Sequence, residues 1–223
     1  RTQRELRLLT GEDLGNGTSR WNNWWSDHRD SFQLPSAAEA QAEEDTRTSR
    51  RSSNSTQSSF YGLSIASERV VFVIDLSGSM NFKTKTGQTR LDVLRKELDR
   101  FLAAFPSGGL FNMIFFGNDA TKWRPKLSVM SDSLRADARA HVKSLSAPGA
   151  TAVYDGLFAA FEDQRVDTIY LLTDGGPSGG SVDDRDEIIS EVNRWNSLRH
   201  IVINSVAVGR DSALLRALSS ASQ

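Results

Sequence analysis

Cysteine is absent from the 223-residue chain, and its absence excludes several kinds of chemistry at once. Without a thiol the chain can form no disulfide, no thiolate metal site and no cysteine nucleophile. The cellular compartment is not indicated by this absence, because a chain without thiols works in either redox setting. A bacterial extracytoplasmic location is one hypothesis.

Long apolar runs and an excess of charge of one sign are also missing. No run approaches the roughly 18 apolar residues of a membrane span, so we expect no membrane insertion. The 27 Lys and Arg residues against 28 Asp and Glu residues give a formal net charge of -1. No global field therefore attracts nucleic acid, and we do not expect nucleic acid to bind through this chain. The first residues resemble neither a signal peptide nor an initiator methionine, which indicates an internal piece of a longer protein.

Three zones differ in composition. The first, residues 1–35, has two short helical patterns, one of leucines near residues 6–9 and one formed by Trp21, Trp24 and Trp25 at helical spacing. We expect a small helical pair that completes a neighbouring repeat or packs on the main domain, the alternative being an aromatic ligand platform. The second zone, residues 36–59, has no apolar residue larger than alanine. It is predicted to be a flexible linker, because it buries too little surface to offset its ordering entropy.

The third zone, residues 60–223, alternates strand and helix signals, which is typical of an α/β fold with a mainly parallel sheet covered on both faces. The continuous apolar run 69–74 predicts a buried central strand. The other predicted strands are 110–116, 166–172, 201–208 and a short edge strand within 123–130. The predicted helices are 89–105, 131–145, 153–162, 183–198 and 211–220.

Oxygen-bearing side chains follow two of these strands and precede one helix. Asp75, Ser77 and Ser79 come directly after the central strand, Asp174 follows the strand 166–172, and Thr151 begins a helix after a glycine turn. In open parallel sheets, ligands gather beyond the carboxyl ends of the strands. Hydroxyl and carboxylate oxygens suit a hard cation such as Mg²⁺. Each piece alone would be an ordinary turn or helix cap, but their joint placement predicts a divalent-metal site.

The three runs resemble a known set of loops. Asp-Leu-Ser-Gly-Ser-Met at 75–80, Gly-Ala-Thr-Ala-Val-Tyr-Asp at 149–155 and Thr-Asp-Gly at 173–175 are similar to the metal-ion-dependent adhesion site (MIDAS) of von Willebrand factor A-like domains. The resemblance covers about residues 60–223. It implies a Rossmann-like, doubly wound sheet in the order 3-2-1-4-5-6 with one antiparallel edge strand.

The resemblance also implies a role for each site residue. Ser77 and Ser79 would bind the metal directly, Thr151 directly or through water, and Asp75 and Asp174 mostly through water. The vacant position would take an Asp or Glu carboxylate from a protein partner. The expected ion is Mg²⁺, with Mn²⁺ and Ca²⁺ as alternatives.

The chain departs from the family pattern at two places. Ala150 stands where glycine is common, which should only stiffen the turn. The chain stops at Gln223, where the family usually continues into a glycine pair and a last strand, so we expect that strand to be lacking here. The metal loops lie upstream of this point.

Three basic residues follow the first metal loop, namely Lys83, Lys85 and Arg90. The ordinary interpretation is a solvated basic loop, and the alternative is that they attract an acidic partner. Asp155 is expected to serve the first turn of its helix, where negative charge is favoured.

The sequence therefore predicts a metal-dependent protein-interaction module, for adhesion or scaffolding, with no catalytic residue and no organic cofactor. Only two acidic side chains at a doubly charged ion leave it electrophilic towards an incoming acid. One alternative is a phosphotransferase resembling haloacid dehalogenases, but these need a second aspartate where this chain has Ser77. Another is an RNA- or ribonucleoprotein-binding protein resembling the Ro family, because residues 8–25 resemble the end of HEAT-like helical repeats.

Overall fold

The computed structural model describes residues 6, 9–12, 14, 18–42, 45–46, 59–60, 63–64, 67–208 and 213–221. Most of the predicted linker and Leu8 of the first leucine pattern lie outside these residues. In the described part of the chain, no helix is both long enough and apolar enough to cross a membrane.

A mainly parallel sheet runs through the third zone in the order β5-β4-β3-β7-β8. The central strand β3 (Arg69–Asp75) pairs in parallel with β4 (Leu110–Phe116) and β7 (Thr168–Thr173), and β7 pairs in parallel with β8 (Val202–Ala207). The edge strand β5 (Ala120–Lys122) and the short β6 (Ser128–Val129) are antiparallel to β4. If β3, β4, β5, β7 and β8 are renumbered 1 to 5 along the sequence, their order in the sheet is 3-2-1-4-5. This order matches the first five positions of the expected order 3-2-1-4-5-6. Among the described strands, β8 is the outer one on its side.

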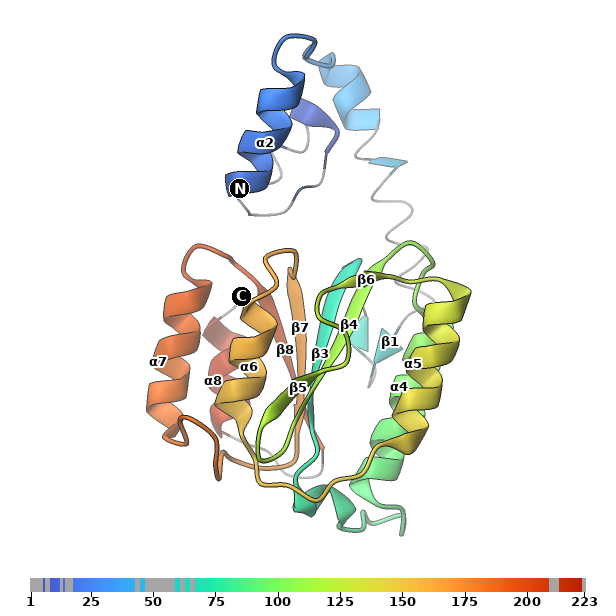
Figure 1. The fold of residues 1–223 in the computed structure, drawn as a ribbon, viewed down its shortest axis with the longest axis vertical. Coiled ribbons are helices and arrows are strands. Elements are labelled where there is room, and N and C mark those ends of the chain that lie inside the picture. The colour runs from blue at the N-terminus through green and yellow to red at the C-terminus, as the bar shows by residue number, and fades with distance from the viewer. Residues whose placement is uncertain are drawn as a thin grey trace.

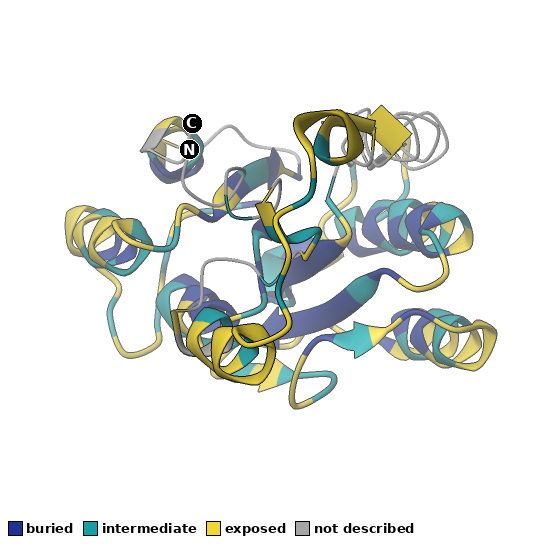
Figure 2. Ribbon diagram, turned by 90° about the horizontal axis from the view of Figure 1, so that it is seen from above, coloured by how far each residue is buried: buried dark blue, intermediate teal, exposed yellow. Residues whose placement is uncertain are grey.

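Helices cover both faces of this sheet (Figures 1 and 2). One face carries α4 (Arg90–Ala104) and α5 (Asp132–Ser144). The other carries α6 (Val153–Phe161), α7 (Arg185–Asn196) and α8 (Ala213–Ala221). Figure 2 shows the strands buried between helices whose outer faces are exposed. The expected Rossmann-like, doubly wound fold is confirmed.

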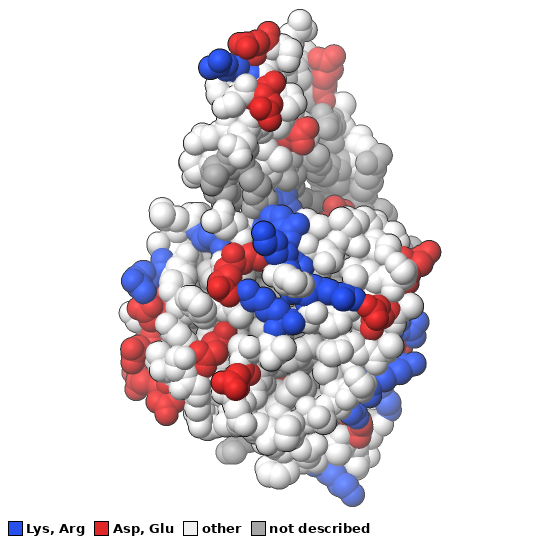
Figure 3. Space-filling model, viewed as in Figure 1, with Lys and Arg blue, Asp and Glu red and all other residues white. Residues whose placement is uncertain are grey.

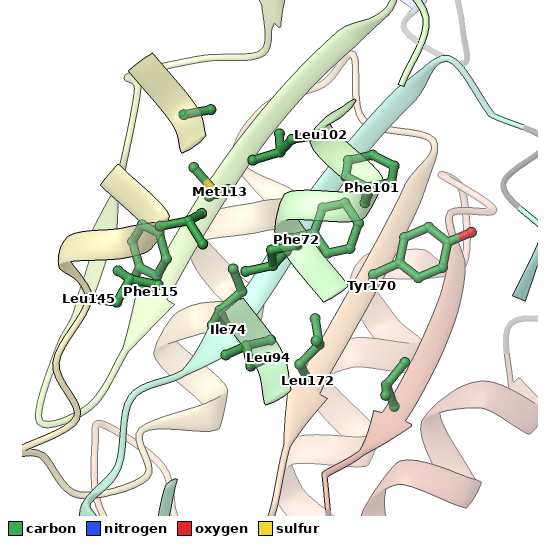
Figure 4. Packing of buried hydrophobic residues seen from close by; sticks show 14 of the residues in the cluster. Phe72, Ile74, Leu94, Phe101, Leu102, Met113, Phe115, Leu145, Tyr170 and Leu172 are labelled. Atoms are coloured by element: carbon green, nitrogen blue, oxygen red, sulfur yellow. The ribbon is translucent and has the colours of Figure 1, made fainter. Parts of the chain in front are cut away.

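The side chains of β3 alternate between two hydrophobic cores, as the pleat of a strand requires. Val70, Phe72 and Ile74 face α4 and α5, and Val71 and Val73 face the other helices. Figure 4 shows the first core, in which the Phe72 ring lies 4.6 Å from the ring of Phe101 and 5.1 Å from that of Tyr170, measured between centroids. A strand buried on both faces explains why residues 69–74 are continuously apolar.

The predicted edge strand was placed too late in the sequence. It was expected within residues 123–130, but β5 begins at Ala120 and β6 covers only two residues. The chain reverses directly after β4, because the Gly117 amide donates to the Asp119 carbonyl at 3.0 Å. Pairing with β4 therefore starts three residues before the tryptophan that marked the predicted strand.

The first zone contains the predicted tryptophan helix, α2 (Thr18–His28). Trp24 stacks on His28 and meets Phe32 edge-on, so the tryptophans belong to a local aromatic cluster. Residues 37–42, inside the predicted linker, are helical, and a Ser36–Glu39 capping box stabilises their start. Two antiparallel strands of two residues each, β1 (Ser59–Phe60) and β2 (Leu63–Ser64), lie at the start of the third zone.

The loop between α5 and α6 is fastened to the turn after β3 at the carboxyl edge of the sheet, which is the lower edge in Figure 1. The Gly78 amide donates to the Gly149 carbonyl at 2.8 Å, and the Gly149 amide donates to the Leu76 carbonyl at 3.2 Å. A Cβ on Gly149 would lie 2.7 Å from the Cα of Gly117. Only glycine allows this approach between two backbones.

We expect Gly149→Ala to lower the free energy of unfolding by about 1–3 kcal/mol, the usual range for overpacking. The new methyl group would force the α5–α6 loop away from the two turns that it contacts. Urea unfolding followed by circular dichroism measures the change. Gly176→Ala is the matched control, because a Cβ there would meet no described atom within 4 Å. Equal stability of the two variants would contradict the close-approach argument.

Candidate metal centre

Asp75 is completely buried at the end of β3, and both of its carboxylate oxygens accept hydrogen bonds. Oδ1 accepts from the Ser77 amide at 2.7 Å, and Oδ2 accepts from the Thr173 hydroxyl at 2.5 Å. Burial raises the pKa of Asp75, the two hydrogen-bonding partners lower it, and the nearby charge of Asp174 raises it further. The carboxylate thus shapes the turn and joins the ends of β3 and β7.

A continuous row of oxygens lies beside this turn. Ser79 belongs to the short 3₁₀ helix η1 (Gly78–Asn81), which follows Ser77. The hydroxyl oxygens of Ser77 and Ser79 are 3.0 Å apart, and the Ser79 hydroxyl donates to Oδ1 of Asp174 at 2.6 Å. Asp174, the residue after β7, is buried. The structure therefore brings Asp75, Ser77, Ser79 and Asp174 into one hydrogen-bonded cluster.

Thr151 lies at the same edge of the sheet and is buried. Its loop is held by the Gly149 contacts described above, and its carbonyl accepts from the Ser178 amide at 3.2 Å. Ala150, the departure from the family pattern, donates its amide to the Asn118 side chain at 2.9 Å. The alanine is thus accommodated in an ordered turn.

The spacing of these oxygens suits a small divalent ion. An octahedral Mg²⁺ with ligands at about 2.1 Å has neighbouring ligands roughly 3.0 Å apart. The Ser77–Ser79 distance of 3.0 Å matches that edge, and the Ser79–Asp174 distance of 2.6 Å is close to it. No group of three or more His, Asp or Glu side chains within the described residues could hold a metal. A metal here would depend on hydroxyl ligands, as the sequence predicts.

Arg90 is a member of this cluster that the sequence prediction missed. It is the first residue of α4, and its guanidinium donates to Oδ2 of Asp174 and lies 3.4 Å from the Ser79 carbonyl. The Arg90 side chain is 14% exposed and that of Asp174 1% exposed. The interpretation of Arg90 as part of a solvated loop is therefore wrong, whereas Lys83 and Lys85 are exposed.

A sequence signal for Arg90 did exist. Thr89 caps α4, its hydroxyl accepting from the Asp92 amide at 3.0 Å, so the helix begins at Arg90. Side chains in a helix point back towards its N-terminus, which here faces the carboxyl edge of the sheet. A cation in the first helical turn after a metal loop is thus aimed at the site.

Asp155 has a second role besides the expected one. It lies in the first turn of α6, as predicted, and its Oδ2 also accepts from the Ser181 amide at 2.9 Å. A Cβ on Gly180 would lie 2.3 Å from that oxygen. Asp155 therefore fastens the loop after β7 to the helix that follows Thr151.

Several comparisons place this geometry among known proteins. A family model of the von Willebrand factor type A domain matches residues 68–223. The human inter-alpha-trypsin inhibitor heavy chain H4 is 34% identical over 136 residues, which cover 56% of this chain and 14% of the heavy chain. Heavy chain H1 from Sus scrofa is 31% identical over 137 residues, with the same coverage. The chain thus matches a small part of these relatives.

Solved structures share the fold at lower identity. Proximal thread matrix protein 1 from the mussel byssus, solved with a zinc-occupied MIDAS motif, has a TM-score of 0.52 and 20% identity. That match covers 70% of this chain and 41% of the mussel protein. An aerotolerance-related membrane protein from Bacteroides fragilis has a TM-score of 0.52 and 18% identity, covering 69% of this chain and 87% of that one. With the family match over residues 68–223, these findings show that the chain belongs to the von Willebrand factor type A domain family.

Proposed function

We propose that residues 68–223 form a divalent-metal-dependent protein-interaction module. The metal would be held by Asp75, Ser77, Ser79, Thr151 and Asp174, and its open position would accept an Asp or Glu carboxylate from a partner protein. The row of oxygens from Ser77 to Asp174, at the spacing of octahedral ligands, is the observation that carries this proposal. Von Willebrand factor type A domains bind a divalent metal at a MIDAS, and the mussel neighbour that shares the fold holds zinc in its MIDAS motif, which supports a divalent metal here. Mg²⁺ is the proposed ion, with Mn²⁺ and Ca²⁺ as alternatives.

The charge of the site favours an anionic ligand. Counted as formal charges, the carboxylates of Asp75 and Asp174 and the guanidinium of Arg90 sum to -1. A doubly charged ion brings the site to +1, a charge that attracts a carboxylate. Without Arg90 the loaded site would be neutral. Arg90 thus strengthens the attraction of the metal-loaded site for a carboxylate.

The same residues argue against a phosphotransferase. A nucleophilic Asp75 would have to meet a substrate, but the residue is completely buried, and Ser77 stands where such enzymes need a second aspartate. We therefore propose a binding site and no reaction.

The ribonucleoprotein alternative gains no support from the surface. Figure 3 shows Lys and Arg side chains close together on the face that carries β5 and α6, with acidic side chains around them. Lys122 of β5 forms a salt bridge with Glu162 at 2.7 Å, and Arg124, shortly after β5, forms one with Asp137. Paired charges of this kind give no strong positive potential for a phosphate backbone. The repeat-like origin of residues 1–35 stays a prediction.

We expect Ser77→Ala and Thr151→Ala each to weaken Mg²⁺ binding by tenfold or more without unfolding the domain, since even outer-shell partners of a metal contribute about 10–100-fold. Titration calorimetry on the metal-free chain measures the affinity, and capture of cross-linked partners with and without chelator measures the interaction. Ser190→Ala, at an exposed position on α7, is the control. Partner capture that is equal with and without chelator would refute the proposed function.

Arg90→Met should have opposite effects on the metal and on the partner. Losing the positive charge removes repulsion, so we expect Mg²⁺ to bind several-fold more tightly. Partner binding in saturating Mg²⁺ should weaken, because the loaded site loses its net positive charge. In chelator, unfolding should become easier by about 3 kcal/mol, since the buried carboxylate of Asp174 loses its partner.

Calorimetry and thermal unfolding with and without Mg²⁺ test this expectation, and Arg90→Lys, which keeps the charge, is the control. A purely structural role of Arg90 would weaken metal and partner binding together. That outcome would overturn the charge argument while leaving the metal site itself intact.

A further inference from the structure

A short hairpin, residues 82–89, stands directly beside the metal centre. Lys83 and Thr89 form an antiparallel bridge, and the Thr84 amide donates to the Gln88 carbonyl at 2.8 Å. Gly87, at φ +82°, turns the chain in the left-handed region that favours glycine. The hairpin is thus ordered by its own hydrogen bonds.

The base of the hairpin is fastened to the residues of the metal centre. The Phe82 amide donates to the Ser79 carbonyl at 3.0 Å, and the Arg90 amide donates to the Phe82 carbonyl at 3.0 Å. Phe82, at the start of the hairpin, is therefore hydrogen-bonded to two residues of the site, and Arg90 directly follows the end of the hairpin. Its position relative to a bound metal would be fixed.

Phe82 presents an aromatic ring to solvent at this place. The residue is 62% exposed, and the guanidinium carbon of Arg90 lies 5.8 Å from the ring centroid. The same guanidinium binds Asp174, so a single side chain spans the distance between the ring and the site. One exposed hydrophobic residue is ordinary, but aromatic rings held rigidly beside polar groups are typical anchors of interfaces.

The charged side chains of the hairpin itself are all positive. Lys83 and Lys85 are exposed, and residues 76–91 contain no Asp or Glu. Asp92, the first acidic residue after them, is engaged by Thr89 and Arg95. The charges of Lys83 and Lys85 lie on the hairpin beside the site, so they add to the positive charge of a metal-loaded site.

From this arrangement we infer that the hairpin selects partners whose metal-bound Asp or Glu is flanked by a large apolar residue and by further acidic residues. The inference rests on the proposed function and specifies its partner. The apolar side chain would cover Phe82, and the acidic ones would face Lys83 and Lys85. A partner chain rises roughly 3.3–3.6 Å per extended residue, so its apolar residue would stand a few residues from the carboxylate that it flanks.

The test uses dense surfaces of short synthetic peptides and the full 223-residue chain as the analyte. The parent peptide is Gly-Leu-Gly-Asp-Glu-Glu-Gly, made also in reversed order because the direction of binding is open. In three derivatives, leucine is replaced by serine, both glutamates by glutamine, or the aspartate by asparagine. Binding is measured by biolayer interferometry in Mg²⁺ and in chelator.

We expect the parent peptide to bind about fivefold or more tightly than the serine derivative, because a half-buried leucine contributes roughly that factor. Phe82→Ala should abolish this preference, and Phe82→Tyr should retain it. The double variant Lys83→Gln, Lys85→Gln should abolish the preference for glutamate over glutamine. Phe158→Ala, which removes another exposed phenylalanine, is the control and should change neither preference.

The outcomes separate this inference from the function on which it rests. If all peptides that contain the aspartate bind alike and only in Mg²⁺, the hairpin has no selectivity and the inference fails, while the proposed function stands. If the parent peptide binds equally in Mg²⁺ and in chelator, or binds as well without its aspartate, carboxylate docking itself fails. Concentration-dependent dimerisation that Phe82→Ala abolishes would show that a second copy covers the ring, and would also overturn the inference. Sedimentation velocity measures that dimerisation.

Discussion

The buried carboxylate of Asp75 is the contact on which the arrangement of the site depends. It closes the turn after β3 through the Ser77 amide and reaches across to Thr173 at the end of β7. Because a buried carboxylate needs compensating donors, these two bonds fix the turn relative to the neighbouring strand. The serine hydroxyls then lie within hydrogen-bonding distance of each other, and that of Ser79 bonds to Asp174.

The sheet places this turn at the edge where ligands bind in folds of this type. On either side of β3, which pairs with both β4 and β7, the connecting helices lie on opposite faces of the sheet. Crevices in doubly wound folds open at such a point, beyond the carboxyl ends of the strands. The α5–α6 loop crosses this edge, and the glycine contact between residues 117 and 149 sets how closely it approaches. Backbone contacts of its loop place Thr151 at this same edge of the sheet.

The sequence predicted well those elements whose own residues carry a hydrophobic or capping pattern. The apolar run 69–74 and the capped pattern of 89–105 each specify a structure locally, and β3 and α4 begin and end within one or two residues of the prediction. The edge strand was misplaced because its start depends on a backbone reversal at residues 117–119 and on pairing with β4, neither of which has a hydrophobic pattern. In the predicted linker, a Ser36–Glu39 capping box produces a helical stretch that hydrophobicity does not reveal.

The convergence of the three polar loops was predictable because two of them follow strands and one precedes a helix, in an order that brings them to one edge of the sheet. Arg90 was missed because a cation in a polar stretch looks the same in sequence whether it is solvated or paired, and only the fold brings it to Asp174. Its position would change the charge of the proposed metal site. A site with two carboxylates and no counter-charge would hold a divalent ion as a neutral unit, which leaves the ion electrophilic but adds no net charge to attract an acid. With one carboxylate already paired to an arginine, the ion would keep an unbalanced charge, and the energy of binding a partner's carboxylate would come from that imbalance.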